Sequence, residues 1–490
     1  MLYSKKILKL WTSLVTLCAL ALGAALLWSA MQSKPGEFKY VAVGKTKSGM
    51  NISSHEHEDS KRIVPGRDAN TKANGSYKNE EISFSKFSTM KCSNLPLVSP
   101  DVPLTQQWMP VILPSNDSLD YVFAAYLYTN DGRRRVVVTS MTSKNHVPFV
   151  CQIWARSKGS EGKVTHRITP CSGRAVMTPG LFKATLLYCT IKTDEEPFAV
   201  SIVQAKDPCS APHNVLRIQD ASFPGDKNVT VAVCVKPLYG SYGGFNRTAR
   251  LVEFIEIYTM LGAAFFTMYA FDLNYNVTYP ILKYYKQEKR LSIIPWHAPP
   301  NLKQFVNYPK RWYRDIGQTI AQTDCLYRSM RKYTHVAMVD IDEFLIPRSN
   351  MTFQKLFSVL PKHQGVYTFR NRFFRMDNNP QRLSAAFKDS RIRKYRPKTI
   401  IAPRGMRAID KRPKYIALAK GTWGALTHRA KLNHGYKDYV VPVELGAMHH
   451  YRDYIKSLAG EYDPYMLSYK EEILQRMEYV FNETKAMLVN

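Results

Sequence analysis

A short apolar run that ends at three acids constrains the fold of this chain more than any other feature. The run from His335 to Val339 is followed at once by Asp340, Asp342 and Glu343. Such a continuous run is typical of a strand buried on both faces of a parallel sheet, and these sheets bind ligands at the carboxyl ends of their strands. Asp340 and Asp342 are two residues apart. On an extended backbone, we expect both to point to the same side and to share one divalent ion.

The apolar segments after Asn228 alternate between strand-like and helix-like patterns. The strand-like runs are Val229–Val235, Ala263–Phe271, Leu291–Trp296 and the run before Asp340, and the helix-like ones are Leu251–Leu261, Tyr279–Gln287 and Asp315–Tyr333. This order predicts an α/β fold of the mainly parallel type, with helices on both faces of the sheet and a ligand site at the strand ends. No phosphate-binding Gly-rich motif opens a helix here, which argues against a P-loop kinase or a dinucleotide oxidoreductase.

The preceding region, residues 88–222, shows a different pattern of short apolar runs separated by turn residues. Tyr121–Tyr128 and Arg135–Ser140 flank Asn130-Asp131-Gly132, and Asp-Gly between two such runs predicts a hairpin. We expect a small all-β accessory domain here, followed by the α/β domain over residues 223–490.

The first part of the chain predicts a membrane anchor. Residues 10–31 contain no charged side chain and are long enough to cross a hydrocarbon core of roughly 30 Å. Lys5, Lys6 and Lys9 precede them, which favours a cytosolic tail over residues 1–9, a transmembrane signal anchor and a type II topology. A cleaved signal peptide that ends near Ala24–Ala30 is the alternative. Residues 32–87 are polar without apolar periodicity and predict a flexible stem.

Sequons and cysteines agree with a body that lies in the secretory lumen. Asn-x-Ser/Thr occurs at Asn51, Asn74, Asn116, Asn228, Asn246, Asn276, Asn350 and Asn482. The cysteines beyond the predicted span are Cys92, Cys151, Cys171, Cys189, Cys209, Cys234 and Cys325. Because this number is odd, one thiol is expected to be free, buried or used to join chains into an oligomer.

The net charge of the chain limits the classes of ligand that we expect it to bind. A formal net charge of +30 usually suggests nucleic acid, but a lumenal protein does not meet it. Anionic nucleotide-sugars, acidic glycans and lipid headgroups remain. An Asp-x-Asp at a strand end then suggests a metal that holds the diphosphate of a sugar nucleotide.

Five segments in order carry a resemblance to a known family. They are Cys234–Gly240, Leu251–Ala263, Val339–Phe344, Lys411–Ile416 and Met448–Arg452. With these segments the chain resembles glycosyltransferase family 92, inverting Golgi enzymes with a GT-A fold. The resemblance implies a single-pass Golgi membrane protein with a lumenal catalytic domain.

The resemblance also implies a reaction. The chain looks most like the avian members, which transfer galactose from UDP-galactose to terminal galactose of glycoprotein N-glycans in a β-1,4 linkage. Galactosylation of core fucose, as in nematode members, is the alternative. The implied cofactor is Mn²⁺ or Mg²⁺, with Asp342 as the direct ligand, Asp340 bound to the ribose or the metal, and His449 or His450 as a further ligand.

Other site residues follow from the same resemblance. Nucleotide contacts are expected from Tyr239, Asp272, Asp340, Arg412 and Lys414. Inversion needs a carboxylate base to take the acceptor proton, for which Glu444 and Asp453 are the candidates and Asp410 a competitor. The aromatic segment Tyr367–Arg375, with Trp423, is expected to face the acceptor sugar.

Two rival functions use the same residues differently. A lumenal lectin would keep the fold without catalysis, and intact Asp340, Asp342 and Lys414 argue against it. A two-metal phosphoesterase would need more His and Asp ligands than one acidic motif and one histidine pair.

Overall fold

The computed structural model describes a defined part of the chain. It covers residues 90, 92–111, 120–130, 132–143, 147–157, 163–178, 182–192, 195–223, 225, 228–238, 245–271, 275–299, 316–375, 380–452 and 460–488. The predicted cytosolic tail, membrane span and stem lie outside the described residues.

The first half of the described chain forms a closed β-barrel. Its strands are β1 (Met109–Pro110), β2 (Tyr121–Asn130), β3 (Arg133–Ser143), β4 (Phe149–Ser157), β5 (Val164–Met177), β6 (Phe182–Thr190), β7 (Glu195–Gln204) and β8 (Leu216–Asp220). They pair in the order β1-β2-β3-β6-β5-β4-β7-β8, and β2 also pairs with β8. This last pairing closes a ring of β2 to β8, so those strands present no free edge.

The second half is built on a mixed sheet. Its strands are β9 (Val231–Leu238), β10 (Ala263–Ala270), β11 (Leu291–Pro295), β12 (His335–Val339), β13 (Glu343–Pro347), β14 (Val366–Arg375), β15 (Arg404–Gly405), β16 (Ile409–Leu418), β19 (Asp438–Val440), β20 (Gly446–Arg452) and β21 (Glu461–Tyr462). The main path runs β11-β10-β9-β12-β16-β14-β15-β21, and β17 (Thr422–Ala425) pairs separately with β18 (Ala430–Leu432).

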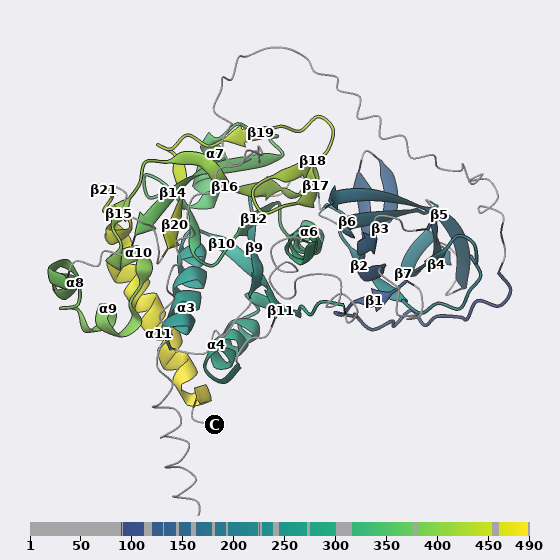
Figure 1. Ribbon diagram of the computed structural model, residues 1–490, viewed down its shortest axis with the longest axis horizontal. Helices are drawn as coiled ribbons and strands as arrows, with labels where there is room; N and C mark the ends of the chain where they lie inside the picture. The colour runs from purple at the N-terminus through teal and green to yellow at the C-terminus, as the bar shows by residue number, and fades with distance from the viewer. Residues whose placement is uncertain are drawn as a thin grey trace, which may run out of the picture. The chain divides into compact units, whose positions relative to one another are not determined.

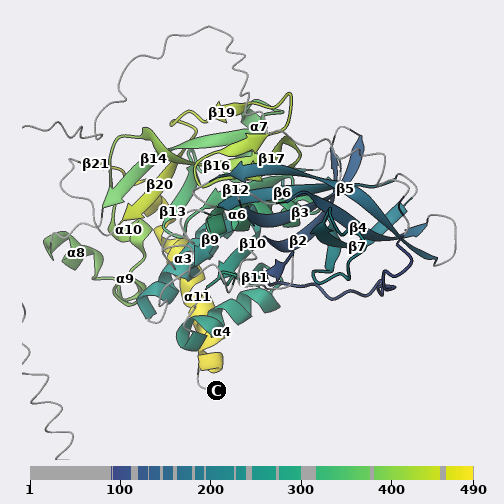
Figure 2. The same ribbon diagram turned by 45° about the vertical axis from the view of Figure 1, so that its right-hand side comes forward.

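The predicted fold class, an α/β GT-A fold with a mainly parallel sheet and helices on both faces, is wrong. Strands dominate. Within this sheet β11, β10, β9 and β12 form one parallel group, and β14 pairs in parallel with β19 and β20. The alternation of strand and helix stops at Val339. Beyond it, β16 pairs antiparallel with both β12 and β14, and β13 pairs antiparallel with β20, without the crossover helices that parallel neighbours need. Figure 2 shows these strands continuing the sheet past β12.

The structure describes eight α-helices in the second half of the chain. They are α3 (Phe245–Met260), α4 (Tyr275–Gln287), α6 (Ile316–Met330), α7 (Phe353–Val359), α8 (Pro380–Ala386), α9 (Ser390–Tyr395), α10 (Lys398–Ile401) and α11 (Lys470–Leu488), with short 3-10 turns at η2 (Ala419–Gly421) and η3 (Tyr465–Tyr469). α3, α4 and α11 pack together, while α6 contacts β9, β17 and the barrel strands β3 and β6 (Figure 1).

Strand β9 contributes alternate side chains to two hydrophobic cores, one on each of its faces. Val231, Val233 and Val235 point into a core shared with α3, α4 and α11. Cys234 points into a second core, which contains α6 and barrel residues such as Phe123. Because successive side chains of a strand point to opposite faces, one buried strand links both layers. The second face is thus covered by α6 together with the barrel.

A buried carboxylate on α6 joins the barrel to the mixed sheet. Asp324 is fully buried and accepts hydrogen bonds from the hydroxyl of Tyr126 on β2 at 2.5 Å and from that of Tyr269 on β10 at 2.6 Å. Arg328, one turn later, donates to Asp324 at 2.6 Å and to Gln219 on β8 at 3.1 Å. Four elements that are distant in sequence therefore depend on one ion pair.

Three disulfides staple the described chain. The pairs are Cys92–Cys209, Cys151–Cys189 and Cys234–Cys325. The last one ties β9 to α6. Among the described cysteines only Cys171 has no disulfide partner, and burial raises its pKa to about 12, so the thiol stays protonated at neutral pH. The expectation of one unpaired thiol is confirmed, while its use between chains stays a prediction.

The predicted Golgi membrane location is also corrected. Among the described residues, no helix is long and apolar enough to cross a membrane. That finding contradicts the single-pass type II assignment as far as the described residues extend. The helix predicted at residues 10–31 lies outside them.

A buried histidine predicts how stability depends on pH. His335, at the start of β12, stacks on Phe357 with ring centroids 4.2 Å apart, and burial lowers its pKa from 6.5 to about 4. At pH values between 4 and 6.5, the unfolded chain binds a proton at His335 and the folded chain does not. The free energy of unfolding therefore decreases as pH falls from 6.5 towards 4. The loss from this group should reach about 3 kcal/mol. Urea titrations at several pH values should show this loss in the native chain but not in His335→Phe. Equal dependence of the free energy of unfolding on pH in both proteins would contradict the prediction.

Candidate functional site

Three neighbouring strands bring two lysines to either side of Asp340. In the sheet order β9-β12-β16, Val339 pairs with Val235 on β9 and Met338 pairs with Tyr415 on β16. The residues just beyond these pairs therefore lie in one row at the carboxyl end of β12. Nζ of Lys414 is 3.0 Å from Oδ1 of Asp340, and Nζ of Lys236 is 3.6 Å from Oδ2.

The acidic motif itself is a turn. After Val339 the backbone bends, and the amide of Glu343 donates to the carbonyl of Asp340 at 3.1 Å. The amide of Asp340 donates to Oε2 of Glu343 at 2.8 Å. The alternation rule for extended strands does not apply within this turn. Glu343 therefore lies beside Asp340, although alternation along an extended strand would have placed it on the opposite face.

Lys414 balances the charges of Asp340 and Glu343 in the buried part of the site. Its side chain is completely buried, and its Nζ is 3.1 Å from Oε2 of Glu343 as well as close to Asp340. Burial, followed by the charge of Asp340, raises the pKa of Glu343 to about 7. Burial opposes ionisation of Asp340, but Lys414 and Lys236 together hold the pKa of that carboxyl well below its usual range. Asp340 therefore remains charged at neutral pH.

Asp342 and His450 form the open side of the site. Oδ2 of Asp342, a side chain that is 40% exposed, is 3.4 Å from Nε2 of His450. Arg452 donates from Nε to the same nitrogen at 3.0 Å, so Nε2 acts as an acceptor. The ring of Phe373 lies against the imidazole, with centroids 4.9 Å apart. β14 and β20 pair in parallel with Phe373 opposite His450, which explains this contact.

The structure separates the two histidines that the sequence treated as alternatives. His449 points to the opposite face of β20, where its Nε2 is 3.1 Å from Arg348 and its Nδ1 is 3.3 Å from the hydroxyl of Tyr451. Asp463 accepts from Arg348 at 2.7 Å in the same network. Burial, then Arg348, lowers the pKa of His449 well below its usual range. The described geometry brings His450, and not His449, to Asp342.

A divalent ion fits the open side only in part. Asp342 can offer a carboxylate oxygen, and His450 can offer Nε2 only in place of its hydrogen bond from Arg452, while Oε1 of Glu343 faces the other ring nitrogen of His450 at 3.5 Å. A carboxylate in that position commonly orients a metal-binding histidine. Both oxygens of Asp340 face lysines, and the described residues contain no cluster of three His, Cys, Asp or Glu groups able to hold an ion. The donor set suits an ion completed by substrate phosphates and water, as is usual for Mg²⁺.

The remaining predicted residues lie in several places. Arg412 is exposed on β16 with a positive φ of 54°. Glu444 is exposed and precedes β20 at the end opposite His450, since Gly446 pairs with Pro347 and His450 with Glu343. Gly446 and His450 are four residues apart on this strand, which corresponds to about 13 Å, so Glu444 lies far from His450.

Four candidate residues from the sequence analysis remain to be located. Tyr239, Asp272 and Asp453 lie outside the described residues. Asp410 is exposed and paired with Arg370 at 2.7 Å. Apart from Asp453, the candidate bases are therefore away from Asp342 or engaged elsewhere.

Sequence reasoning missed the roles of two residues. Glu343 was not among the expected site residues, because alternation along an extended strand points it away from Asp340 and Asp342, and the end of the apolar run at Val339 could have indicated a turn. Lys236 lies in the segment Cys234–Gly240 but was not among the expected site residues. Its position two residues after Cys234 places it on the face covered by α6, and strand order alone brings it to Asp340.

Comparisons with known proteins agree on one family. The family model described as Glycosyltransferase family 92 matches residues 229–485. The chain is similar to "Glycosyltransferase family 92 protein C33H5.2" of Caenorhabditis elegans, 26% identical over 161 residues, which is 30% of this chain and 31% of the relative. It is also similar to "Glycosyltransferase family 92 protein F13G3.3" of the same organism, 28% identical over 127 residues, or 24% of this chain and 23% of the relative. The matches thus span about a third or less of these relatives.

Likeness to solved structures is weak. "Crystal Structure of a Mycobacterial Protein" is 11% identical and covers 56% of this chain and 81% of its own, with a TM-score of 0.23. The structure "WbbM bifunctional glycosytransferase apo structure" is 10% identical and covers 32% of this chain and 27% of its own, with a TM-score of 0.17. Neither bears on the fold.

Proposed function

The chain belongs to glycosyltransferase family 92, and on that premise we propose that it transfers galactose from UDP-galactose to a terminal galactose of glycoprotein N-glycans. The proposed linkage is β-1,4, formed with inversion and with a divalent ion at the site. One observation carries the proposal. Asp340 is held between Lys236 and Lys414 at the carboxyl end of β12, and Asp342 with His450 lies at the open side of the same cluster.

The diphosphate of the donor would lie at this open side. Lys414 is completely buried and bound to two carboxylates, so it serves to fix Asp340 and Glu343. The side chain of Lys236 is 22% exposed and is the better candidate to contact a phosphate. Asp340 would position this ammonium and the turn, and the low pKa of its carboxyl keeps Asp340 ionised between the two lysines.

Electrostatics favour a cation between the donor and the protein. A nucleoside diphosphate brings two to three negative charges beside Asp342, which is already an exposed carboxylate. Asp342 and His450 would hold Mn²⁺ or Mg²⁺, which when bound neutralises the charge that develops on the leaving diphosphate. Arg452 lies next to His450 and adds a further positive charge to this side.

The sugar-binding side is proposed next to the same histidine. Phe373 is partly exposed and stacks near His450, and Arg452 lies 5.7 Å from the centre of its ring. An aromatic face is suited to the apolar face of galactose. The other rings of the predicted acceptor segment, Tyr367, Phe369 and Phe374, are buried. Asp453 stays a prediction for the base that takes the acceptor proton.

The test is release of UDP by the purified chain in the presence of Mn²⁺. UDP-galactose, UDP-glucose and UDP-N-acetylgalactosamine are each offered with a galactose-terminated N-glycan, a core-fucosylated glycan and no acceptor. We expect turnover that requires UDP-galactose and the galactose-terminated acceptor, with the linkage identified by NMR of the product. Turnover on core fucose alone would overturn the acceptor assignment. Glycan binding without any turnover would favour a lectin.

A further inference from the structure

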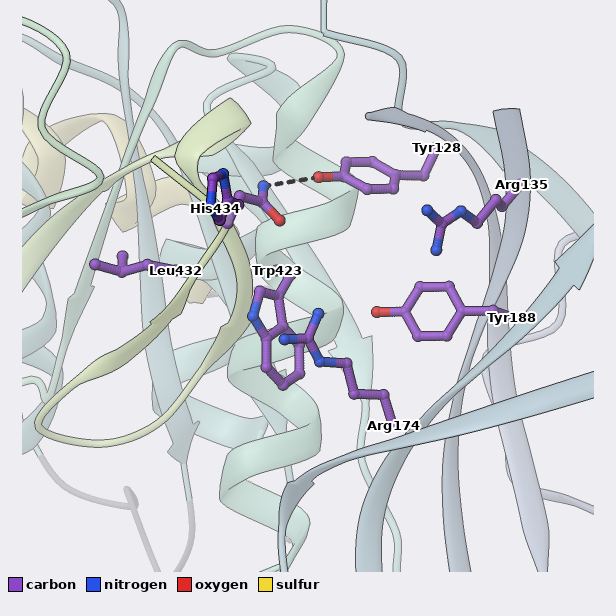
Figure 3. Close-up of a pocket in the computed structure, with 8 residues that line it drawn as sticks. Tyr128, Arg135, Arg174, Tyr188, Trp423, Leu432 and His434 are labelled. Carbon is purple, nitrogen blue, oxygen red and sulfur yellow. Dashed lines mark hydrogen bonds between the residues drawn. The ribbon is translucent and has the colours of Figure 1, made fainter. Parts of the chain in front are cut away.

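A cavity lies between the barrel and the second half of the chain, away from the site described above. It has a volume of about 200 Å³. Barrel strands contribute Tyr128, Arg135, Arg174 and Tyr188, and the region of β17 and β18 contributes Trp423, Leu432, Asn433 and His434. Figure 3 shows the two arginines and the three aromatic rings around the same space.

We propose that this cavity binds one acidic sugar, carrying a carboxylate or a sulfate, at the end of a glycan. The inference goes beyond the proposed transfer reaction, because it assigns a second saccharide site that takes no part in catalysis. The arginines, the aromatic walls, the size and the position of the cavity support it.

The arginines make the cavity positive. The guanidinium carbon of Arg174 lies 3.5 Å from the ring centre of Trp423, and that of Arg135 lies 5.6 Å from the ring centre of Tyr188. In the described part of the chain, neither arginine forms an ion pair with a carboxylate. Arginine binds planar or tetrahedral oxyanions through two parallel hydrogen bonds. Two such groups at one small cavity favour an anionic ligand.

The walls favour a sugar over a bare ion. Tyr128, Tyr188 and Trp423 are each less than 10% exposed, so packing fixes their rings around the cavity next to the arginines. Aromatic rings bind the apolar faces of sugar rings, and Nδ2 of Asn433 holds the hydroxyl of Tyr128 in place by donating to it at 3.0 Å. The volume is below the roughly 300–1,000 Å³ of pockets for drug-sized ligands, so a single sugar unit fits better than an oligosaccharide.

The position separates this cavity from the donor site. The amide of Ala419 donates to the carbonyl of Thr334, which precedes the first residue of β12. Trp423 follows four residues later and accepts at its carbonyl from Tyr327, near the end of α6. The cavity thus lies towards the amino end of β12, whereas Asp340 follows its carboxyl end. A ligand there would be a branch of the acceptor glycan or another glycan, and not the reacting sugar.

The test uses calorimetric titration of the full chain with four probes: 3′-sialyllactose, galactose 6-sulfate, lactose and sodium sulfate. The variant Arg135→Gln/Arg174→Gln removes both guanidinium groups. Arg133→Gln is the control, because it removes one positive charge from an exposed position of β3, and it is compared with each single variant, Arg135→Gln and Arg174→Gln, as well as with the double variant. Each titration is repeated in the Asp342→Ala background, so that binding at the donor site does not contribute to the result. Thermal unfolding of each variant checks that the fold is retained.

We expect both acidic sugars to bind, and lactose and sulfate to bind at least about tenfold more weakly. The double variant should lose at least about tenfold in affinity for the acidic sugars, and Arg133→Gln should not. Absence of binding by the unsubstituted chain, equal affinity for sulfate alone, or equal binding by the double variant would each overturn the proposal.

Discussion

Replacement of Asp342 by alanine is expected to lower the rate of UDP release by about a hundredfold or more, the usual cost of removing one group that stabilises developing charge. Asp342 is the exposed carboxylate at the open side of the cluster, 3.4 Å from His450. Because its side chain is 40% exposed, the substitution should leave the unfolding midpoint nearly unchanged. The measurement is kcat for UDP-galactose with Mn²⁺, beside a thermal unfolding curve.

A matched control separates this effect from a loss of charge in general. Glu288→Ala removes an exposed carboxylate just after α4, outside the cluster, and should keep full activity. His450→Gln should reproduce the loss seen for Asp342→Ala, together with a higher requirement for Mn²⁺, whereas His449→Gln should not change that requirement. Retention of activity within threefold by Asp342→Ala would show that the cluster is not the donor site.

The second large effect concerns stability. Asp324→Ala should lower the free energy of unfolding by about 3–5 kcal/mol, because it leaves the buried Arg328 charge and two tyrosine hydroxyls without their acceptor. Asp324 is completely buried, so water cannot compensate for the missing carboxylate. The loss should appear in urea titration as a lower midpoint.

Asp220→Ala provides the comparison within the same junction. Asp220 pairs with Arg331 at 2.9 Å, but the two side chains are 48% and 50% exposed. An exposed pair of this kind contributes about 0–1 kcal/mol. Similar losses for both variants, or a loss below about 1 kcal/mol for Asp324→Ala, would contradict the role assigned to the buried pair.

Local patterns predicted the individual elements of the second half well. The runs assigned to strands at Val229–Val235, Ala263–Phe271 and Leu291–Trp296 correspond to β9, β10 and β11, and the helix assigned to Asp315–Tyr333 corresponds to α6. These segments are buried, so their side-chain periodicity follows directly from the layers they pack between. The prediction of a mainly parallel sheet failed for the strands after Asp340. Their neighbours in the sheet come from distant parts of the chain, and no local pattern encodes whether such neighbours run parallel or antiparallel.

The amino-acid sequence by itself determined the family, the buried strand before Asp340 and the acids that follow it, because each depends on residue order and local periodicity. Only the tertiary structure decided that β16 returns beside that strand and β20 beside β13, that Lys236 and Lys414 flank Asp340, and that His450 rather than His449 meets Asp342. It also decided that β2 and β8 close a barrel. The physical reason is that these contacts join residues tens to hundreds of positions apart. Strand order and register, which depend on packing of the whole core, determine which of those residues meet.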